Sequence, residues 1–390
     1  MIAIGQQLKP PTYYIRKYMK AFGVGCFHFS LKDNIDKEIS VQEYIDEITK
    51  TLKNLTTTSD VTISFDEDIK DEKIDTSPPN PKIREGDNGY PLITFLNLTF
   101  KIYIPSRIQA ELINLPEEYL DTGTENFKIT VRHEWHGPVS YIECLSATED
   151  TLPSTAVQVV REFLTKEIQK TETFLEYDFL GPSPFHANFY LNESDTAIES
   201  SSFTLNEIKS RAYNTLKFNY NANKFKNEDK ALEELQEALA DELSFFYQLN
   251  KDARFSLKKW GEIQDTTNSI LELQEKTNKK NIIKRTIEKP KLFQKAFKDI
   301  GLFKGYLIFR KGQIASDYAA MYKSGESETY LQEYIDQEIS EHPQYPLNET
   351  SELIKYFDQK NSKAIELLTI ISAGILGGIV GSTITIAFGS

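Results

Sequence analysis

The last 24 residues of the chain, 367–390, contain no charged side chain, although 26% of the whole 390-residue sequence is charged. As a helix this segment would be about 36 Å long, enough to cross a hydrocarbon core of roughly 30 Å. Lys355, Lys360 and Lys363 precede it and no charge follows it, so the positive-inside tendency places the preceding residues in the cytoplasm. We therefore expect one C-terminal transmembrane helix at about 367–388, in a tail-anchored, single-pass protein of the cell (inner) membrane.

The small residues of this segment fall on one side of the predicted helix. Small side chains let helix backbones approach closely, which is a main route to helix association in lipid. The face therefore indicates that copies of the chain self-associate in the membrane, and the alternative is a plain anchor. The residues of this membrane-helix packing face are Gly374, Gly377, Gly378, Gly381, Ser382 and Thr385.

The first half of the chain has the pattern of a mixed α+β cytosolic domain, which we expect over 1–200. The clearest strand is 96–104, where apolar and polar residues alternate with the period of two that buries one face of a strand. Apolar residues at helical spacing predict helices at 41–55 and after Pro153. Residues 66–91 combine many charges with prolines and glycines, which predicts a long exposed insertion.

The pattern after residue 200 predicts a helical domain over 201–347. Thr204 and Glu207 have the spacing of a capping box, which marks the start of a helix. From Leu232 to Ile270, apolar residues recur at alternating steps of three and four, the seam of a long, coiled-coil-like helix. We expect an α-helical stalk built around this helix.

A further stalk helix is expected from Asn348 and should continue into the membrane, so that 348–390 form one rod. The stalk-to-membrane junction of CorA-type divalent cation transporters resembles residues 363–373 of this chain, KAIELLTIISA. That family also places an α/β domain, long helices and the membrane in this order, so the resemblance implies a ring of subunits that passes divalent cations. The family's Gly-Met-Asn signature and second membrane helix are absent, because residues 378–381 read GIVG before the chain ends, and no site residue is carried over.

A basic stretch interrupts an acidic chain. Between Lys276 and Lys311 there are twelve Lys and Arg against two acidic residues, whereas the whole chain has a net charge of −13. Its apolar residues share one helical face flanked by lysines, as in helices that lie in the headgroup region of anionic bilayers. The alternatives are packing of this face on the protein and binding of a nucleotide or nucleic acid, against which the acidic balance argues. The candidate membrane-surface residues are Lys291, Phe293, Lys295, Phe297, Lys298, Phe303 and Lys304.

No cluster in the sequence has the spacing of a catalytic or metal site. The 133–136 motif, His-Glu-Trp-His, lacks the helical i, i+4 spacing of zinc enzymes, and Gly23-x-Gly25 lacks the third glycine of a phosphate loop. Cys26 and Cys144 are too few for a disulfide framework, and we expect reduced, buried thiols. The sequence thus nominates no catalytic residue, metal ligand or cofactor, although an enzyme is left open.

Together these features predict a tail-anchored membrane effector, of the kind used in bacterial anti-phage defence. Its cytosolic domain would sense a signal, and its membrane helix would self-associate to perturb or permeabilise the bilayer. The expected partners are the lipid bilayer, further copies of the chain, and an activating protein or small ligand. Two alternatives are a divergent CorA-like cation channel or transporter, and a tail-anchored scaffold or enzyme whose membrane helix only fixes its location.

Overall fold

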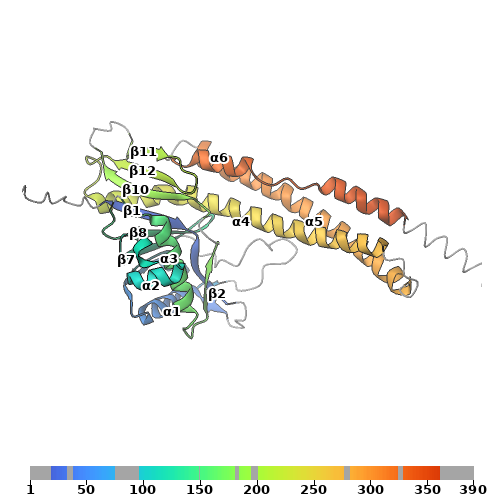
Figure 1. Cartoon of the computed structure of the whole chain (residues 1–390), viewed down its shortest axis with the longest axis horizontal. Helices are drawn as coiled ribbons and strands as arrows, with labels where there is room; N and C mark the ends of the chain where they lie inside the picture. Colours follow the sequence, from blue (N-terminus) through green and yellow to red (C-terminus); the bar gives the residue numbers. More distant parts are fainter. Residues whose placement is uncertain are drawn as a thin grey trace, which may run out of the picture. The chain divides into compact units, whose positions relative to one another are not determined.

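The computed structural model describes residues 19–32, 38–74, 96–148, 150–180, 184–194, 201–275, 282–323 and 328–360. The chain divides into two compact units (Figure 1). The sheet unit contains the described residues as far as Asn250 together with 328–338, and the helical unit contains Lys251–Lys323 together with 339–360. Helix α4 (Glu228–Glu275) contributes residues to both units.

An eight-stranded sheet forms the centre of the sheet unit within the described residues, in the order β11-β12-β10-β1-β8-β7-β6-β4. Neighbouring strands are antiparallel, except that β10 and β12 are parallel. The strand predicted at 96–104 is confirmed as β6. The strands are β1 (Lys20–Gly25), β4 (Thr58–Ser64), β6 (Asn97–Tyr103), β7 (Asn126–Glu134), β8 (Gly137–Cys144), β10 (Ala187–Glu193), β11 (Phe203–Ile208) and β12 (Asn214–Tyr220).

Smaller elements complete the sheet unit. The helices predicted at 41–55 and after Pro153 are confirmed as α1 and α3. Two further strand pairs are β2 (Phe27–Leu31) with β9 (Leu175–Phe179) and β3 (Ile39–Ser40) with β5 (Lys73–Ile74). The helices are α1 (Val41–Asn54), α2 (Ser106–Ile113), α3 (Pro153–Ile168) and α6 (Gln332–Ser340), with 3₁₀ turns at Glu67–Ile69 and Glu117–Tyr119.

Local chemistry explains where these helices start and how closely they pack. At the start of α1, the Glu43 N–H donates to Ser40 Oγ at 3.2 Å, and the Ser40 N–H donates to the Glu43 carboxylate at 3.1 Å, which is a complete capping box. Helix α3 packs on β1 at Gly23, where a Cβ would lie 2.4 Å from Val157 Cγ2 and 2.5 Å from the Pro153 carbonyl oxygen. Gly23 therefore serves close helix–strand packing.

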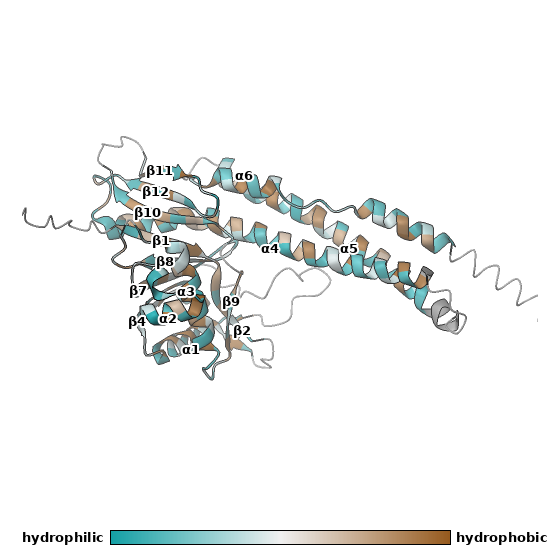
Figure 2. Cartoon of the chain, in the orientation of Figure 1, coloured by the Kyte–Doolittle hydropathy of each residue, from teal (hydrophilic) through white to brown (hydrophobic). Residues whose placement is uncertain are grey.

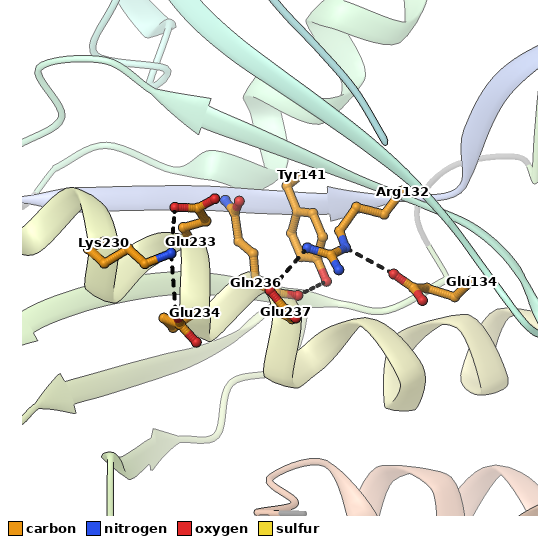
Figure 3. A network of polar contacts seen from close by, with 8 residues as sticks. All are labelled: Arg132, Glu134, Tyr141, Lys230, Glu233, Glu234, Gln236 and Glu237. Carbon is orange, nitrogen blue, oxygen red and sulfur yellow. Dashed lines mark hydrogen bonds and ion pairs between the residues drawn. The ribbon is translucent and has the colours of Figure 1, made fainter. Parts of the chain in front are cut away.

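Polar contacts attach the first part of α4 to the sheet (Figure 3). The buried Tyr141 hydroxyl of β8 donates to the main-chain carbonyl of Gln236 in α4 at 2.7 Å. Arg132 of β7 donates to Glu134 at 2.9 Å and lies 3.8 Å from Glu237 of α4. Because Tyr141 alternates with core residues of the other sheet face, α4 packs on the face opposite to α3. Figure 3 also shows the α4 ion pairs of Lys230 with Glu233 and Glu234.

The sheet continues beyond the residue at which the sequence pattern predicts a change to helices. Thr204 and Glu207 lie in the strand β11, so the predicted capping box is wrong. In the next strand, Leu216 and Phe218 are buried while Lys217 between them is half-buried, the alternation of a strand with one inward face. Pairing with β12 over six residues satisfies the backbone groups on one side of β11, and this pairing outweighs a local helix-start signal.

The prediction of a transmembrane helix is corrected. No helix in the described part of the chain combines the length and the apolar composition needed to cross a membrane. The predicted fold class, the tail-anchored topology and the membrane localisation all depended on such a helix. The long helices that are described carry charged residues along their length, which are costly in hydrocarbon. The segment 367–388 and the stalk beyond Lys360 lie outside the described residues.

Candidate functional site: an uncovered face of helix α5

In the helical unit, α5 (Ile282–Lys323) packs antiparallel on the second part of α4. The Phe255 ring of α4 lies 4.8 Å from the Tyr306 ring of α5, centroid to centroid. Further along, Ile270 of α4 shares a buried cluster with Phe293 of α5. Because residue numbers rise along α4 as they fall along α5, the two helices form an antiparallel hairpin (Figure 1).

A buried ion pair fixes the register of this hairpin. The Asp252 carboxylate of α4 is 4% exposed and accepts hydrogen bonds from Arg310 Nε at 2.9 Å, from Arg310 Nη2, and from the Tyr306 hydroxyl at 3.3 Å. Burial raises the pKa of Asp252, and the Arg310 guanidinium opposes this rise. A slip of the helices would leave a buried charge without its partner, which is strongly destabilising.

One face of α5 is covered inside the helical unit. Phe293, Ala296, Ile300 and Phe303, at steps of three and four, are buried with Ile263 and Ile270 of α4 and with Leu347 and Ile354 of the helical segment 347–360. The predicted membrane-surface residues Phe293 and Phe303 thus belong to this core, and Phe297 is half-buried beside it. Lys304 donates to Asn348 Oδ1 at 2.7 Å. Lys291, Lys295 and Lys298 are exposed.

The opposite face of α5 has no charged residue and is exposed within the described part of the chain. Leu302, Ile308 and Phe309 are 50%, 74% and 66% exposed. At 100° per residue, the charged residues of this part of α5 project from other sides of the helix. We call this set the α5 outer face, and its residues are Gly301, Leu302, Gly305, Ile308, Phe309, Gly312, Ala315, Ser316 and the half-buried Ala319.

The glycines of the α5 outer face have no packing role within the described chain. A Cβ placed on Gly301, Gly305 or Gly312 would meet nothing within 4 Å. A glycine in a helix interior costs about 1 kcal/mol relative to alanine. Three glycines therefore destabilise α5, and no contact within the described chain compensates for this cost. Glycine permits another backbone to approach closely.

Apolar residues on two opposite sides are typical of a helix that is covered on both. Exposed apolar residues scattered singly need no explanation, but a continuous apolar face marks an interaction surface. The α5 outer face has no titratable group, and its only polar side chain is the hydroxyl of Ser316. Its chemistry therefore suits binding of another apolar surface, and the face itself supplies neither an acid nor a base that could activate the Ser316 hydroxyl.

The described part of the sheet unit holds no comparable centre of chemistry. Among the described residues, no group of three or more His, Cys, Asp and Glu is placed to hold a metal ion. The His133 ring lies 5.9 Å from that of His28, and the His136 ring lies 5.0 Å from that of Phe245, so the 133–136 motif is divided between two packing environments. Burial lowers the pKa of His133 to about 4, which leaves this ring neutral at pH 7.

The remaining predicted residues fall into two groups. Cys26 and Cys144 are free and buried, which confirms the expected reduced thiols. The membrane-helix packing residues Gly374, Gly377, Gly378, Gly381, Ser382 and Thr385 lie outside the described residues.

The sequence reasoning missed the α5 outer face. It assigned one apolar face to the basic stretch and ended that stretch at Lys311. The available signal was a second series of glycine, alanine and isoleucine, which recur at steps of four and three from Gly301 to Ala319; no member of this series is charged.

Comparison of the chain with models of known protein families, with curated proteins and with solved structures found no match.

Proposed function

We propose that the protein is a non-catalytic scaffold that assembles with further copies of itself through the α5 outer face. The observation that carries the proposal is the exposure of Leu302, Ile308 and Phe309 on an uncharged face of a long helix. In such an assembly, the helical unit supplies the contact and each copy contributes its own sheet unit.

The energetics favour an assembly that depends on protein concentration. Burial of a large apolar side chain contributes about 1.5–3 kcal/mol, so three side chains from each of two copies supply on the order of 10 kcal/mol. Association costs about 4–15 kcal/mol in lost translational and rotational freedom. Because the two terms are of similar size, we expect reversible association rather than an obligate oligomer.

Sedimentation velocity of the full chain over a wide range of protein concentration tests the proposal. We expect a concentration-dependent oligomer, which Ile308→Asp converts to monomer because a carboxylate would be buried without a partner. The matched control is Leu257→Asp, which changes a leucine of similar exposure, 60%, on α4. A monomer at every concentration, or equal effects of both substitutions, contradicts the proposal.

A further inference from the structure

The α5 outer face has a spacing and a sequence of sizes that fit a copy of itself. Its central residues follow steps of four and three, the repeat of a helix–helix seam. Ile308 is the one large side chain of this seam, and the others are small. A partner helix must therefore place a small residue opposite Ile308. The seam residues are Gly301, Gly305, Ile308, Gly312, Ala315 and Ala319.

We propose that two copies of the chain pair through α5 in antiparallel orientation, about a two-fold axis close to Phe309 and Arg310. This proposal rests on the self-association proposed above. In this arrangement Ile308 lies opposite Gly312 of the second copy, and each copy inserts its isoleucine above a glycine of the other. The two-fold axis makes the same patch serve both copies, as in most homodimers.

The small residues form the layers on either side of this central contact. Gly305 lies opposite Ala315 of the second copy, and Gly301 lies opposite Ala319. Each layer therefore joins a glycine to a larger residue, so the helix axes keep a nearly even and short separation. Alternation of large and small side chains across facing positions is how helix interfaces reach close packing.

A parallel pairing fills the same seam poorly. It places Ile308 against Ile308 and each glycine against the same glycine. The isoleucine layer would set the separation of the helices, and voids would remain at Gly305 and Gly312. A void of methyl size costs about 1 kcal/mol, and larger cavities cost more in proportion to their volume.

Charge repulsion at the rim of the seam disfavours the antiparallel pair, but it is weaker than the packing difference. In the antiparallel pair, Lys311 of one copy approaches Lys311 of the other, beside the seam. Like charges on an exposed helix surface cost a few tenths of a kcal/mol, and salt screens them. The packing difference is larger, so the antiparallel arrangement is favoured.

The size of the contact agrees with reversible pairing. Residues 301–319 span roughly 27 Å of helix, and a strip about 10 Å wide covers on the order of 300 Å² on each copy. Stable interfaces cover about 800 Å² per partner. The pair should therefore form at high protein concentration and dissociate on dilution.

Cysteine cross-linking of the full chain tests the orientation. Cys26 and Cys144 are buried, so an introduced surface cysteine is the main target of a short bismaleimide. Near the axis, Phe309→Cys should cross-link to itself. In an antiparallel pair the two copies of position 301 are about 27 Å apart, so Gly301→Cys alone should not cross-link. A mixture of Gly301→Cys and Ala319→Cys chains should cross-link at least several-fold more than either alone.

Each other outcome has a defined meaning. If Gly301→Cys cross-links to itself and the mixture adds nothing, the pair is parallel; the orientation is overturned while the proposed self-association stands. If the chain sediments as a monomer at every concentration, both proposals fail. A monomer in which Ile308→Cys resists maleimide would mean that another segment of the same chain covers the face, and it would also overturn both. Leu257→Cys on α4 serves as the cross-linking control.

Discussion

The two long helices of the helical unit, α4 and α5, both bury an apolar inner face, but their outer faces differ in polarity. The exposed side of α4 is polar, with Leu257 as its single exposed large apolar residue among the described ones. The α5 outer face has no charged residue, and the exposed Lys311 lies beside it. Figure 2 shows apolar and polar stretches alternating along both helices. The exposed charged residues of α4 in this unit are Arg254, Lys258, Glu262, Asp265 and Glu272.

This difference shows that the α5 outer face is a property of that helix and not of the hairpin as a whole. Both helices bury one apolar side, so both satisfy the requirement for a packed core. The outer face of α4 is suited to water, and that of α5 is suited to another apolar surface.

The largest expected effect separates the two faces of α5. Phe303 is 4% exposed. Phe303→Ala should lower the free energy of unfolding by about 3–5 kcal/mol, because removal of a buried aromatic ring leaves a cavity. Phe309→Ala should change the unfolding free energy by no more than about 0.5 kcal/mol, while weakening self-association. Urea unfolding at low protein concentration measures the first effect and sedimentation the second. Equal losses of stability would show that both faces are packed within one chain.

A smaller effect is expected at the ion pair that joins the inner faces. Asp252→Ala should cost about 3 kcal/mol of unfolding free energy, because the half-buried Arg310 would lose its carboxylate partner. The control is Lys230→Ala, which removes exposed ion pairs with Glu233 at 3.1 Å and Glu234 at 3.2 Å on α4 and should cost less than about 0.5 kcal/mol. The same urea experiment measures both, and a loss below about 1 kcal/mol for Asp252→Ala would contradict the assigned role.

The smallest expected effect compares glycines of the two helices. A Cβ at Gly261 of α4 or at Gly305 of α5 meets nothing within 4 Å, so alanine at either position should stabilise the chain by up to about 1 kcal/mol. Only Gly305→Ala should also alter self-association, because only that glycine lies in the proposed seam. Thermal unfolding and sedimentation of the two variants check this, and identical behaviour of both would remove Gly305 from the interface.

Much of the fold follows from repeated local patterns. The seam from Leu232 to Ile270 predicts one long helix because the step of three and four recurs over many turns, and α4 confirms the helix. The alternation at 96–104 predicts β6 for the same reason. The strands β11 and β12 were missed because they are short and because Thr204 with Glu207 imitates a helix start. These segments are strands because they pair with each other and with β10. The local spacing of residues gives no information about that pairing.

The candidate site shows the same division. Helical periodicity places Phe293 with Phe303 on one side of α5 and Gly305 with Ile308 on the other. Periodicity does not say what covers either side. From the sequence alone, the side with Phe293 and Phe303 is assigned to a membrane surface. Contacts with α4 and with residues 347–360 cover that side and leave the second one exposed.

By itself, the sequence determined which residues share a helix face or a strand face, because side-chain direction follows backbone geometry from residue to residue. It also determined the acidic balance and the local +10 charge of the basic stretch. Only the tertiary structure decided which apolar face of α5 is buried, since burial depends on residues that are distant in the chain, such as Asp252 with Arg310. The α5 outer face became visible as a site once those contacts had accounted for the other face.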